Sequence, residues 1–393
     1  MTKEDEKHEI LQTSEDDQLS AEAVLEQYDS SSSYRKKMSP IWVWVTTGVG
    51  VIFSLFQLYT AIFGTLPSNQ QRGFHVAMAL GLIYLLYPAN KKDDGKVGWF
   101  SWVATGMFVT VIGLIYYQEK IHLGTALAGI VVLILFQLAK LYDKRYPNIP
   151  LYDIILAAFG FAVGLYQFFY FEQIIARVGM YNDIDFIIAG AGVLLVLEAA
   201  RRVVGLPIVA VAGLMLVYAH IGPFLPGFLE HRGFSIHRII SHSFLSMEGV
   251  FGIPISISAT FIYLYMMFGV ILQRTGLEKF FSDLAMSMTG WMIGGTAKVG
   301  VLTSVFSGMI TGSSVANTVG NGAFTIPMMK RAGYKPEYAA AVEAASSTGG
   351  QIMPPIMGSA AFLMIEFTGL TYQEILKAAI IPALLFFVGQ FIA

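Results

Sequence analysis

The sequence predicts an all-α polytopic membrane protein, and three observations lead to this fold class. Hydrophobic residues make up 55% of the 393 residues and charged residues 13%, roughly half the charged share of about 25% in soluble domains. The apolar residues come in blocks of about 20, the length that crosses ~30 Å of hydrocarbon. Basic residues collect in every second loop between these blocks. Several helices are therefore expected to span a bilayer.

Residues 1–40 differ from these blocks because they are polar and, from Glu4 to Asp29, mostly acidic. A signal peptide has a basic start and an apolar centre, so this segment is interpreted as a cytoplasmic polar tail. The chain contains no cysteine, which excludes disulfides, zinc–thiolate sites and iron–sulfur clusters.

The apolar blocks predict helix positions and their orientation. Membrane helices are expected at roughly 41–63, 73–88, 99–117, 122–141, 151–171, 184–199, 203–221 and 251–272. The basic loops lie at 35–37, 91–96, 140–145 and 201–202. Because basic residues are retained in the cytoplasm, the N terminus is placed inside. Glu198, beside Arg201 and Arg202, is expected to form a structural ion pair.

The loop over 221–250 is the longest between predicted helices, and the orientation places it outside the cell. Arg232, His237 and Arg238 make it a candidate docking surface for another protein. The alternative is that these residues only cap helices and contact lipid headgroups.

An amphipathic helix is predicted over 277–291, where apolar residues repeat at helical spacing between charged ones. It is expected to lie along the cytoplasmic interface. It would act either as a lever between two bundles or as a plain surface anchor.

A re-entrant hairpin is predicted after this helix. Residues 294–310 are largely apolar, and the polar, glycine-rich run 311–322 follows them. The next apolar stretch ends in a cytoplasmic basic cluster of Lys330, Arg331 and Lys335, so the segment enters and leaves on the same side. Its tip is expected near 312–317, where protein or a hydrated cavity must satisfy the backbone.

A broken helix is predicted next, because 346–355 places two glycines and two prolines inside an otherwise apolar segment. Broken helices expose carbonyls at one half-helix end and N–H groups at the other, and these ends bind cations and anions. Hydroxyl and amide oxygens suit sodium rather than a transition metal. The alternative for a single Ser-Ser or Gly-Gly pair is close helix packing. Glu343, just before the break, is either a buried functional carboxylate or a residue at headgroup level.

Two stretches of the chain resemble a known family. The run GSSVANTVGNGAFTIPMMKRAGYKPEYAAAVEAASSTGGQIMPPIMGSAAF (312–362) resembles the signature of the large membrane subunit of tripartite ATP-independent periplasmic (TRAP) transporters. VLEAARRVVG, together with the outer loop HRGFSIHRIISHSFLSMEGVFGIPISISATFIYLYMMFG, resembles the fused form, in which small and large membrane subunits are one polypeptide. The fused form usually works with a receptor of the TAXI type.

This resemblance implies a function, a location and a set of site residues. Such proteins import organic acids or similar small anions across the bacterial plasma (inner) membrane with a sodium gradient, receiving substrate from an extracytoplasmic substrate-binding receptor. Sodium is then the coupling ion, with no other cofactor, no catalytic residue and no nucleic-acid partner. The residues that the resemblance assigns to sodium binding are Ser313, Ser314, Asn317 and Thr318 at the hairpin tip and Ser346, Ser347, Thr348, Gly349 and Gly350 at the break. Pro354 and Pro355 would hold the break open.

The family fold is of the elevator type, with two inverted repeats, each holding a hairpin and a broken helix. One hairpin and one broken helix are predicted here before Ala393, so the chain is expected to end after the first repeat. The expected regions are a tail (1–40), N-terminal membrane helices including small-subunit-like ones (41–220), the external loop (221–250) and the first repeat (251–393).

Two other readings remain open at the level of sequence. A receptor-independent divalent-anion/sodium symporter would share the hairpin and the break, and a non-transporting membrane fragment is the second reading. An enzyme is not expected, because the sequence shows no His/Asp/Glu cluster, nucleophile elbow or phosphate-binding glycine loop with its lysine.

Overall fold

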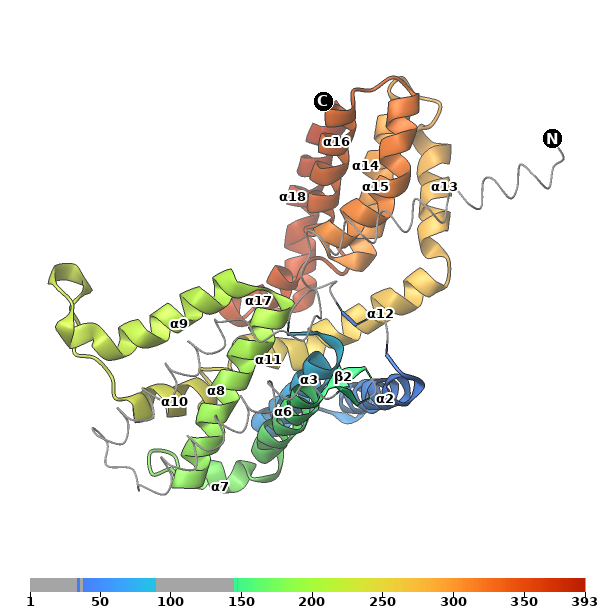
Figure 1. Cartoon of the computed structure of the whole chain (residues 1–393). Coiled ribbons are helices and arrows are strands. Elements are labelled where there is room, and N and C mark those ends of the chain that lie inside the picture. The colour runs from blue at the N-terminus through green and yellow to red at the C-terminus, as the bar shows by residue number, and fades with distance from the viewer. Residues whose placement is uncertain (1–33, 36–37, 90–144, 147, 393) are drawn as a thin grey trace. The chain divides into compact units, whose positions relative to one another are not determined.

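The computed structural model describes residues 34–35, 38–89, 145–146 and 148–392. The expected helices 99–117 and 122–141 and most of the tail 1–40 lie outside the described residues. The described chain forms two compact units, one within Ser33–Ala259 (the N-terminal unit) and one within Thr260–Ala393 (the C-terminal unit). Apart from two-residue strands β1 (Arg145–Tyr146) and β2 (Ile149–Pro150), which pair antiparallel, the elements described are helical (Figure 1).

The N-terminal unit is built from helices that match the apolar blocks of the sequence. They are α2 (Pro40–Phe63), α3 (Ser68–Leu86), α6 (Leu151–Phe169), α7 (Phe171–Ala176), α8 (Asp183–Val203), α9 (Leu206–Ile221), α10 (Ile236–Phe244) and α11 (Ile253–Ile257), with short 3₁₀ turns η2 (Gly222–Phe224) and η3 (Gly227–Leu229). Helices α3 and α6 pack along their lengths, and α8 packs against both. The core of this unit lies between these three helices.

Buried charges join the ends of these three helices. Asp153, in the first turn of α6, pairs with Arg35 and with Arg202 of α8, the latter at 2.7 Å. Arg202 also binds Glu198 at 2.9 Å and donates to the carbonyl of Tyr87 just after α3 at 3.0 Å. The expected ion pairing of Glu198 is confirmed, and it belongs to a larger network that fixes α3, α6 and α8 together.

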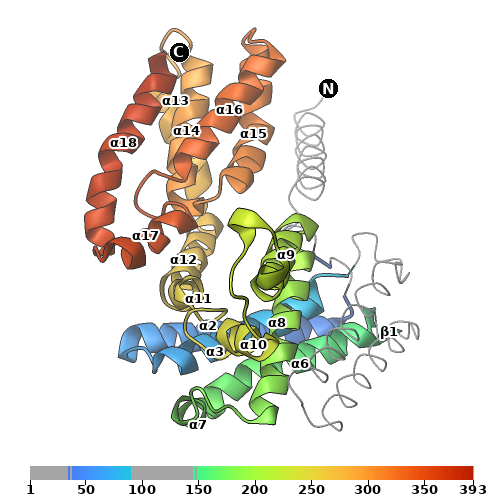
Figure 2. The same cartoon turned by 90° about the vertical axis from the view of Figure 1, so that its left-hand side faces the viewer.

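The C-terminal unit holds the predicted hairpin and broken helix. After the π-helical turn η4 (Ser258–Ile262), its helices are α12 (Tyr263–Arg274), α13 (Leu277–Thr289), α14 (Gly295–Thr311), α15 (Ser314–Arg331), α16 (Pro336–Gly350), α17 (Ser359–Thr368) and α18 (Tyr372–Ile392). Helices α14, α15 and α16 pack against one another pairwise. Helix α13 packs on α14, and α18 packs on α14 and α16 (Figure 2).

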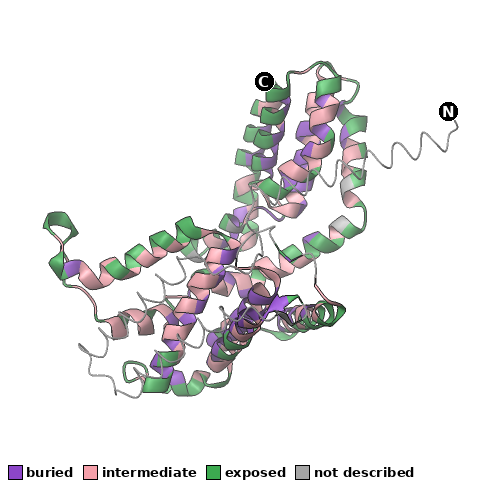
Figure 3. Cartoon of the chain, viewed as in Figure 1, coloured by how far each residue is buried: buried purple, intermediate pink, exposed green. Residues whose placement is uncertain are grey.

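Within the described residues, five helices are long and apolar enough to cross a membrane: Pro40–Phe63, Leu151–Phe169, Leu206–Phe224, Ile253–Leu272 and Tyr372–Ile392. Their apolar side chains remain exposed, as Figure 3 shows for α9, which buries none of its residues. Leu214 on α9 is 67% exposed and Leu385 on α18 is 68% exposed. Such surfaces fit contact with lipid. Helices α14 to α17 are not among the five.

The main difference from the expected elements lies at the break. The sequence predicted an interruption over 346–355, but α16 continues through Ser346–Ser347–Thr348–Gly349 and ends at Gly350. Both glycines remain helical because they are buried against neighbouring helices, Gly349 beside Phe386 and Gly350 beside Gly308. Packing outweighs the low helix propensity of glycine. The observed break covers 351–358.

Candidate functional site

The hairpin tip consists of only two residues, Gly312 and Ser313. Gly312 ends α14 in the left-handed conformation, with φ at 60°, which glycine adopts at no steric cost. Ser313 starts α15, because its hydroxyl accepts a hydrogen bond from the N–H of Ala316 at 3.3 Å. The two helices therefore reverse direction within a very short connection.

The break (351–358) folds back on the end of α14. The N–H of Gly358 donates to the carbonyl of Gln351 at 2.6 Å, and the N–H of Ile356 donates to the carbonyl of Met309 at 3.2 Å. The hydroxyl of Tyr372 lies 2.5 Å from the carbonyl oxygen of Pro355. Pro354 and Pro355 thus lie inside the break, joined by a cis peptide bond.

Direct contacts join the tip to the break. The amide of Gln351 donates to the hydroxyl of Ser314 at 3.0 Å. Gly308 and Gly350 meet so closely that a Cβ on Gly350 would lie 2.7 Å from the Cα of Gly308. The C-terminal ends of α14 and α16 and the N-terminal ends of α15 and α17 therefore converge. These ends carry partial negative and partial positive charge respectively.

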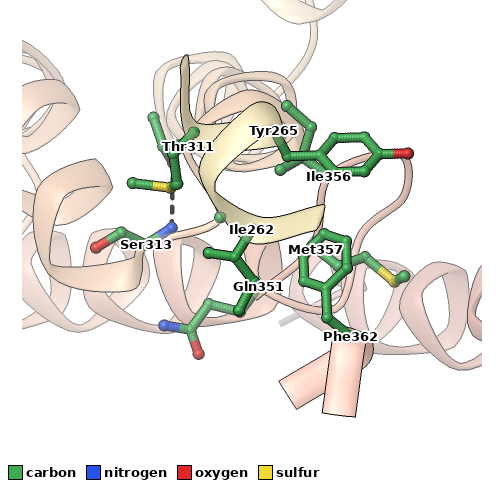
Figure 4. A pocket seen from close by; sticks show the side chains of 10 residues that line it. Ile262, Tyr265, Thr311, Ser313, Gln351, Ile356, Met357 and Phe362 are labelled. Atoms are coloured by element: carbon green, nitrogen blue, oxygen red, sulfur yellow. Dashed lines mark hydrogen bonds between the residues drawn. The ribbon is translucent and has the colours of Figure 1, made fainter. Parts of the chain in front are cut away.

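A cavity of about 360 Å³ opens beside the tip and the break. Figure 4 shows Thr311, Ser313 and Gln351 on one side of it and apolar side chains, including Tyr265 and Phe362, on the other. None of its lining residues carries a charge. The cavity therefore combines an apolar wall with a few neutral polar groups, as small-molecule sites do.

The predicted sodium-binding residues of the hairpin lie at or near this junction. Ser313 and Ser314 are half-buried at the tip, and Thr318 is half-buried on α15. Asn317 is buried, its amide nitrogen lies 2.9 Å from the carbonyl of Ser304, and its amide oxygen accepts from Asn321 at 2.6 Å. The four hairpin residues that were predicted to bind sodium therefore lie close together.

The hydroxyl groups of residues 346–348, by contrast, do not point to the junction of the tip and the break. The Ser346 hydroxyl donates to the carbonyl of Val342 at 2.7 Å, and that of Thr348 donates to the carbonyl of Ala344 at 2.7 Å on an exposed face. Ser347 donates to Glu343 at 2.9 Å. Because these residues remain helical, they contribute side chains to the helix body rather than to the break.

The broken helix was expected to leave carbonyl oxygens without hydrogen bonds at the end of α16, but these carbonyls do accept hydrogen bonds. The donors are the N–H groups three residues further along, at 3.1 to 3.2 Å: Gln351 to Thr348, Ile352 to Gly349 and Met353 to Gly350. Each carbonyl keeps its second lone pair. The break therefore offers partly satisfied acceptors, while Gly349 and Gly350 themselves are buried.

The side chain of Glu343 is fully buried between α14, α15 and α16. Hydroxyls of Ser304, Thr325 and Ser347 surround its carboxylate. Ser304 and Thr325 were not among the polar residues that the sequence analysis singled out. A signal for Thr325 was present in the sequence, since Asn317, Asn321 and Thr325 recur every four residues on one face of α15.

The predicted docking residues of the outer loop divide into two groups. The guanidinium groups of Arg232 and Arg238 lie 5.7 and 5.1 Å from the ring centre of Phe234, and both residues are exposed. His237 instead stacks on Phe186 of α8, with ring centres 4.7 Å apart. Arg232 and Arg238 thus form a basic, exposed surface around one aromatic ring.

A helical hairpin whose tip meets a broken helix, in a chain with several apolar helices, places this chain in a class of polytopic membrane proteins whose architecture is common among secondary transporters. Residues 191–393, just over half of the chain, match the family model described as "Tripartite ATP-independent periplasmic transporter, DctM component". The chain belongs to this family, a family of multi-pass proteins of the bacterial inner membrane. The expected TRAP membership is confirmed.

Several curated proteins are similar to part of this chain. The 2,3-diketo-L-gulonate TRAP transporter large permease protein YiaN of Escherichia coli is 34% identical over 131 residues, covering 33% of this chain and 30% of that protein. The C4-dicarboxylate TRAP transporter large permease protein DctM of Vibrio cholerae is 26% identical over 195 residues, covering 49% of this chain and 39% of that protein. The chain thus spans well under half the length of these relatives. No solved structure matches the chain.

Proposed function

We propose that this chain is the permease component of a sodium-coupled, receptor-dependent secondary importer of organic acids or similar small anions. The observation that carries the proposal is the convergence of four helix ends where the hairpin tip meets the break. Opposite helix ends at one point offer sites for a cation and for an anion.

Sodium fits the cation side of this junction. The C-terminal ends of α14 and α16 provide carbonyl oxygens with partial negative charge, and the tip adds the neutral oxygens of Ser313 and Ser314. These are hard ligands without net charge, which suit a monovalent ion better than a transition metal. Asn317 holds Ser304 of α14 against α15 beside this point. We assign the ion mainly to backbone carbonyls and the tip, rather than to the hydroxyls of 346–348.

A re-entrant placement of the hairpin agrees with the helix lengths and composition. Helices α14, α15, α16 and α17 are not among the described helices that qualify as membrane spans. A hairpin and a broken helix that end inside the bilayer would place their shared junction near its middle, where secondary transporters bind substrate and ion.

The substrate class rests on the relatives. Their printed names include 2,3-diketo-L-gulonate, C4-dicarboxylate and sialic acid, which share an acidic group. The N-terminal ends of α15 and α17 provide the partial positive charge that such a group needs. The exposed pair Arg232 and Arg238 offers a docking surface for an extracytoplasmic receptor. The resemblance of 196–205 and 231–269 to the fused form favours a TAXI-type receptor.

Sodium-dependent stability tests the ion assignment on the chain itself. A ligand that binds only the folded state at 100 times its Kd stabilises by roughly 2.7 kcal/mol, so sodium should raise the melting temperature and potassium at equal ionic strength should not. Asn317→Ala should reduce the sodium-dependent increment. Ser287→Ala should not, because Ser287 is exposed on α13 and its hydroxyl donates to the carbonyl of Leu284 in the same helix.

Identical melting in sodium and potassium would remove the sodium assignment. Uptake into proteoliposomes with and without a candidate receptor separates the importer from a receptor-independent symporter. A chain that binds sodium but moves no substrate under either condition would be a non-transporting fragment.

A further inference from the structure

A buried carboxylate lies deeper in the C-terminal unit than the tip. Glu343 is 0% exposed and contacts hydroxyls from three different helices. The oxygen Oε1 accepts from Ser304 at 2.8 Å and from Ser347 at 2.9 Å, and Oε2 accepts from Thr325 at 2.5 Å. We call these four residues the Glu343 cluster. It lies about two helical turns before the end of α16, or roughly 10 Å at 1.5 Å per residue.

Burial disfavours the charged form of this carboxyl group, and hydrogen bonds that it accepts partly offset this cost. Ser304 and Ser347 donate to Oε1, whereas the Thr325 hydroxyl lies within reach of both Oε2 and the carbonyl oxygen of Asn321. Neutral hydroxyls supply no positive charge, however. Among the described residues no Lys, Arg or His forms an ion pair with Glu343. A buried charge without a partner is costly, so the cluster lacks a counter-charge.

The oxygens of the cluster fit a small, hard cation. Two carboxylate and three hydroxyl oxygens come from α14, α15 and α16, and the carbonyl of Asn321 lies 3.0 Å from the Thr325 hydroxyl. All are oxygen atoms, and the Glu343 carboxyl is the one group among them that can carry a charge. Such a set matches a monovalent ion better than a divalent or transition metal, which take more carboxylates or nitrogen and sulfur ligands.

Polar side chains connect the Glu343 cluster to the hairpin tip. Asn317 binds the carbonyl of Ser304 at 2.9 Å and accepts from Asn321 at 2.6 Å. Thr325, one turn beyond Asn321 on α15, belongs to the cluster. Hydrogen-bonded polar groups therefore run from Asn317 through Asn321 and Thr325 to Glu343.

We infer that the Glu343 cluster is a second monovalent-cation site, separate from the junction of tip and break, with the Glu343 carboxylate as its charged ligand and sodium as its occupant. The inference depends on the proposed function only for the choice of sodium.

Glu343→Gln isolates the charge from the hydrogen bonds. The amide oxygen can still accept from Ser304 and Ser347, and the amide nitrogen can donate to Thr325, whose hydroxyl then donates to the carbonyl of Asn321. The variant should therefore fold. It should bind one sodium ion fewer per chain in equilibrium binding of radioactive sodium. The sodium-dependent rise in melting temperature should become smaller, because each site stabilises by its own mass-action contribution.

The matched control is Glu337→Gln, an exposed residue in the first turn of the same helix, which should keep the sodium response of the parent. Thr325→Val removes a ligand oxygen at nearly constant volume and should lower sodium affinity in the same direction as Glu343→Gln. It keeps the inference testable if Glu343→Gln is poorly folded.

The two sites can be separated by their variants. If Glu343→Gln binds less sodium than the parent while Asn317→Ala binds as much as the parent, the result supports the Glu343 site and contradicts the junction site. If Asn317→Ala loses sodium and Glu343→Gln binds and melts in sodium as the parent does, the Glu343 site is overturned. A parent chain that binds no sodium and melts at the same temperature with and without sodium overturns the Glu343 site as well.

Discussion

The contact between Gly308 of α14 and Gly350 of α16 allows a sharp test of the junction. A methyl group at position 350 would lie 2.7 Å from the Cα of Gly308 and 3.3 Å from the carbonyl oxygen of Ser304. Non-bonded carbon atoms prefer about 3.5 to 4.0 Å, so Gly350→Ala creates an overlap of about 1 Å. The atoms it meets belong to the backbone and cannot rotate away. The two helices must therefore move apart.

The cost can be estimated from overpacked cores. Inserting a methyl group into a well-packed interior costs typically about 1 to 3 kcal/mol. Each kcal/mol lowers the melting temperature by about 2 to 4 °C in domains of 150 to 250 residues. Gly350→Ala should therefore lower the melting temperature by roughly 2 to 12 °C. It should also weaken the sodium-dependent increment, since Asn317 lies beside Gly350.

Gly320→Ala is the matched control, because a Cβ in the middle of α15 there would meet no other described part of the chain within 4 Å. Alanine is about 1 kcal/mol better than glycine inside a helix, so this variant should melt at the same or a higher temperature. Thermal unfolding of the purified protein in detergent measures both. If Gly350→Ala melts as high as Gly320→Ala, the close packing of α14 on α16 is refuted.

Three further predictions concern orientation, stability and docking. Cysteines introduced at Ser235 and Gly333 should differ in labelling by an impermeant reagent applied outside intact cells, with only position 235 labelled. Asp153→Ala should destabilise by about 3 to 5 kcal/mol, because it removes the buried carboxylate that Arg35 and Arg202 share; denaturant unfolding measures this loss. Reversing Arg232 and Arg238 to Glu should slow receptor-dependent uptake without changing sodium-dependent melting, because surface charges mainly set association rates.

Each of these has its own control. Labelling of position 333 from outside would contradict the re-entrant reading of the hairpin. Glu230→Ala, at an exposed position, should leave unfolding unchanged, and a similar loss for it and for Asp153→Ala would mean that the buried network contributes little. Arg331→Glu, on the expected cytoplasmic side, should not affect receptor docking, so an equal loss of uptake would point to a general charge effect.

Much of the secondary structure could be predicted from the sequence. The expected spans 41–63 and 151–171 agree with α2 and α6 within two residues, and the tip was expected where Gly312 and Ser313 lie. These features depend on local properties: runs of apolar residues, a glycine with positive φ and a capping serine. The break was misplaced by a few residues because Gly349 and Gly350 remain helical when neighbouring helices press on them.

The sequence by itself determined that this protein crosses a membrane, that it carries a hairpin followed by a broken helix, and that it resembles TRAP permeases. Hydropathy, charge and motif are properties of the chain taken in order, so they can be read without a structure. Only the tertiary structure decided that Glu343 is buried and that Ser347 faces it. The tertiary structure also showed that the end of α16 contacts Gly308 of α14. Which side chains converge depends on how each helix is rotated about its axis, and that rotation is set by packing between residues far apart in the sequence.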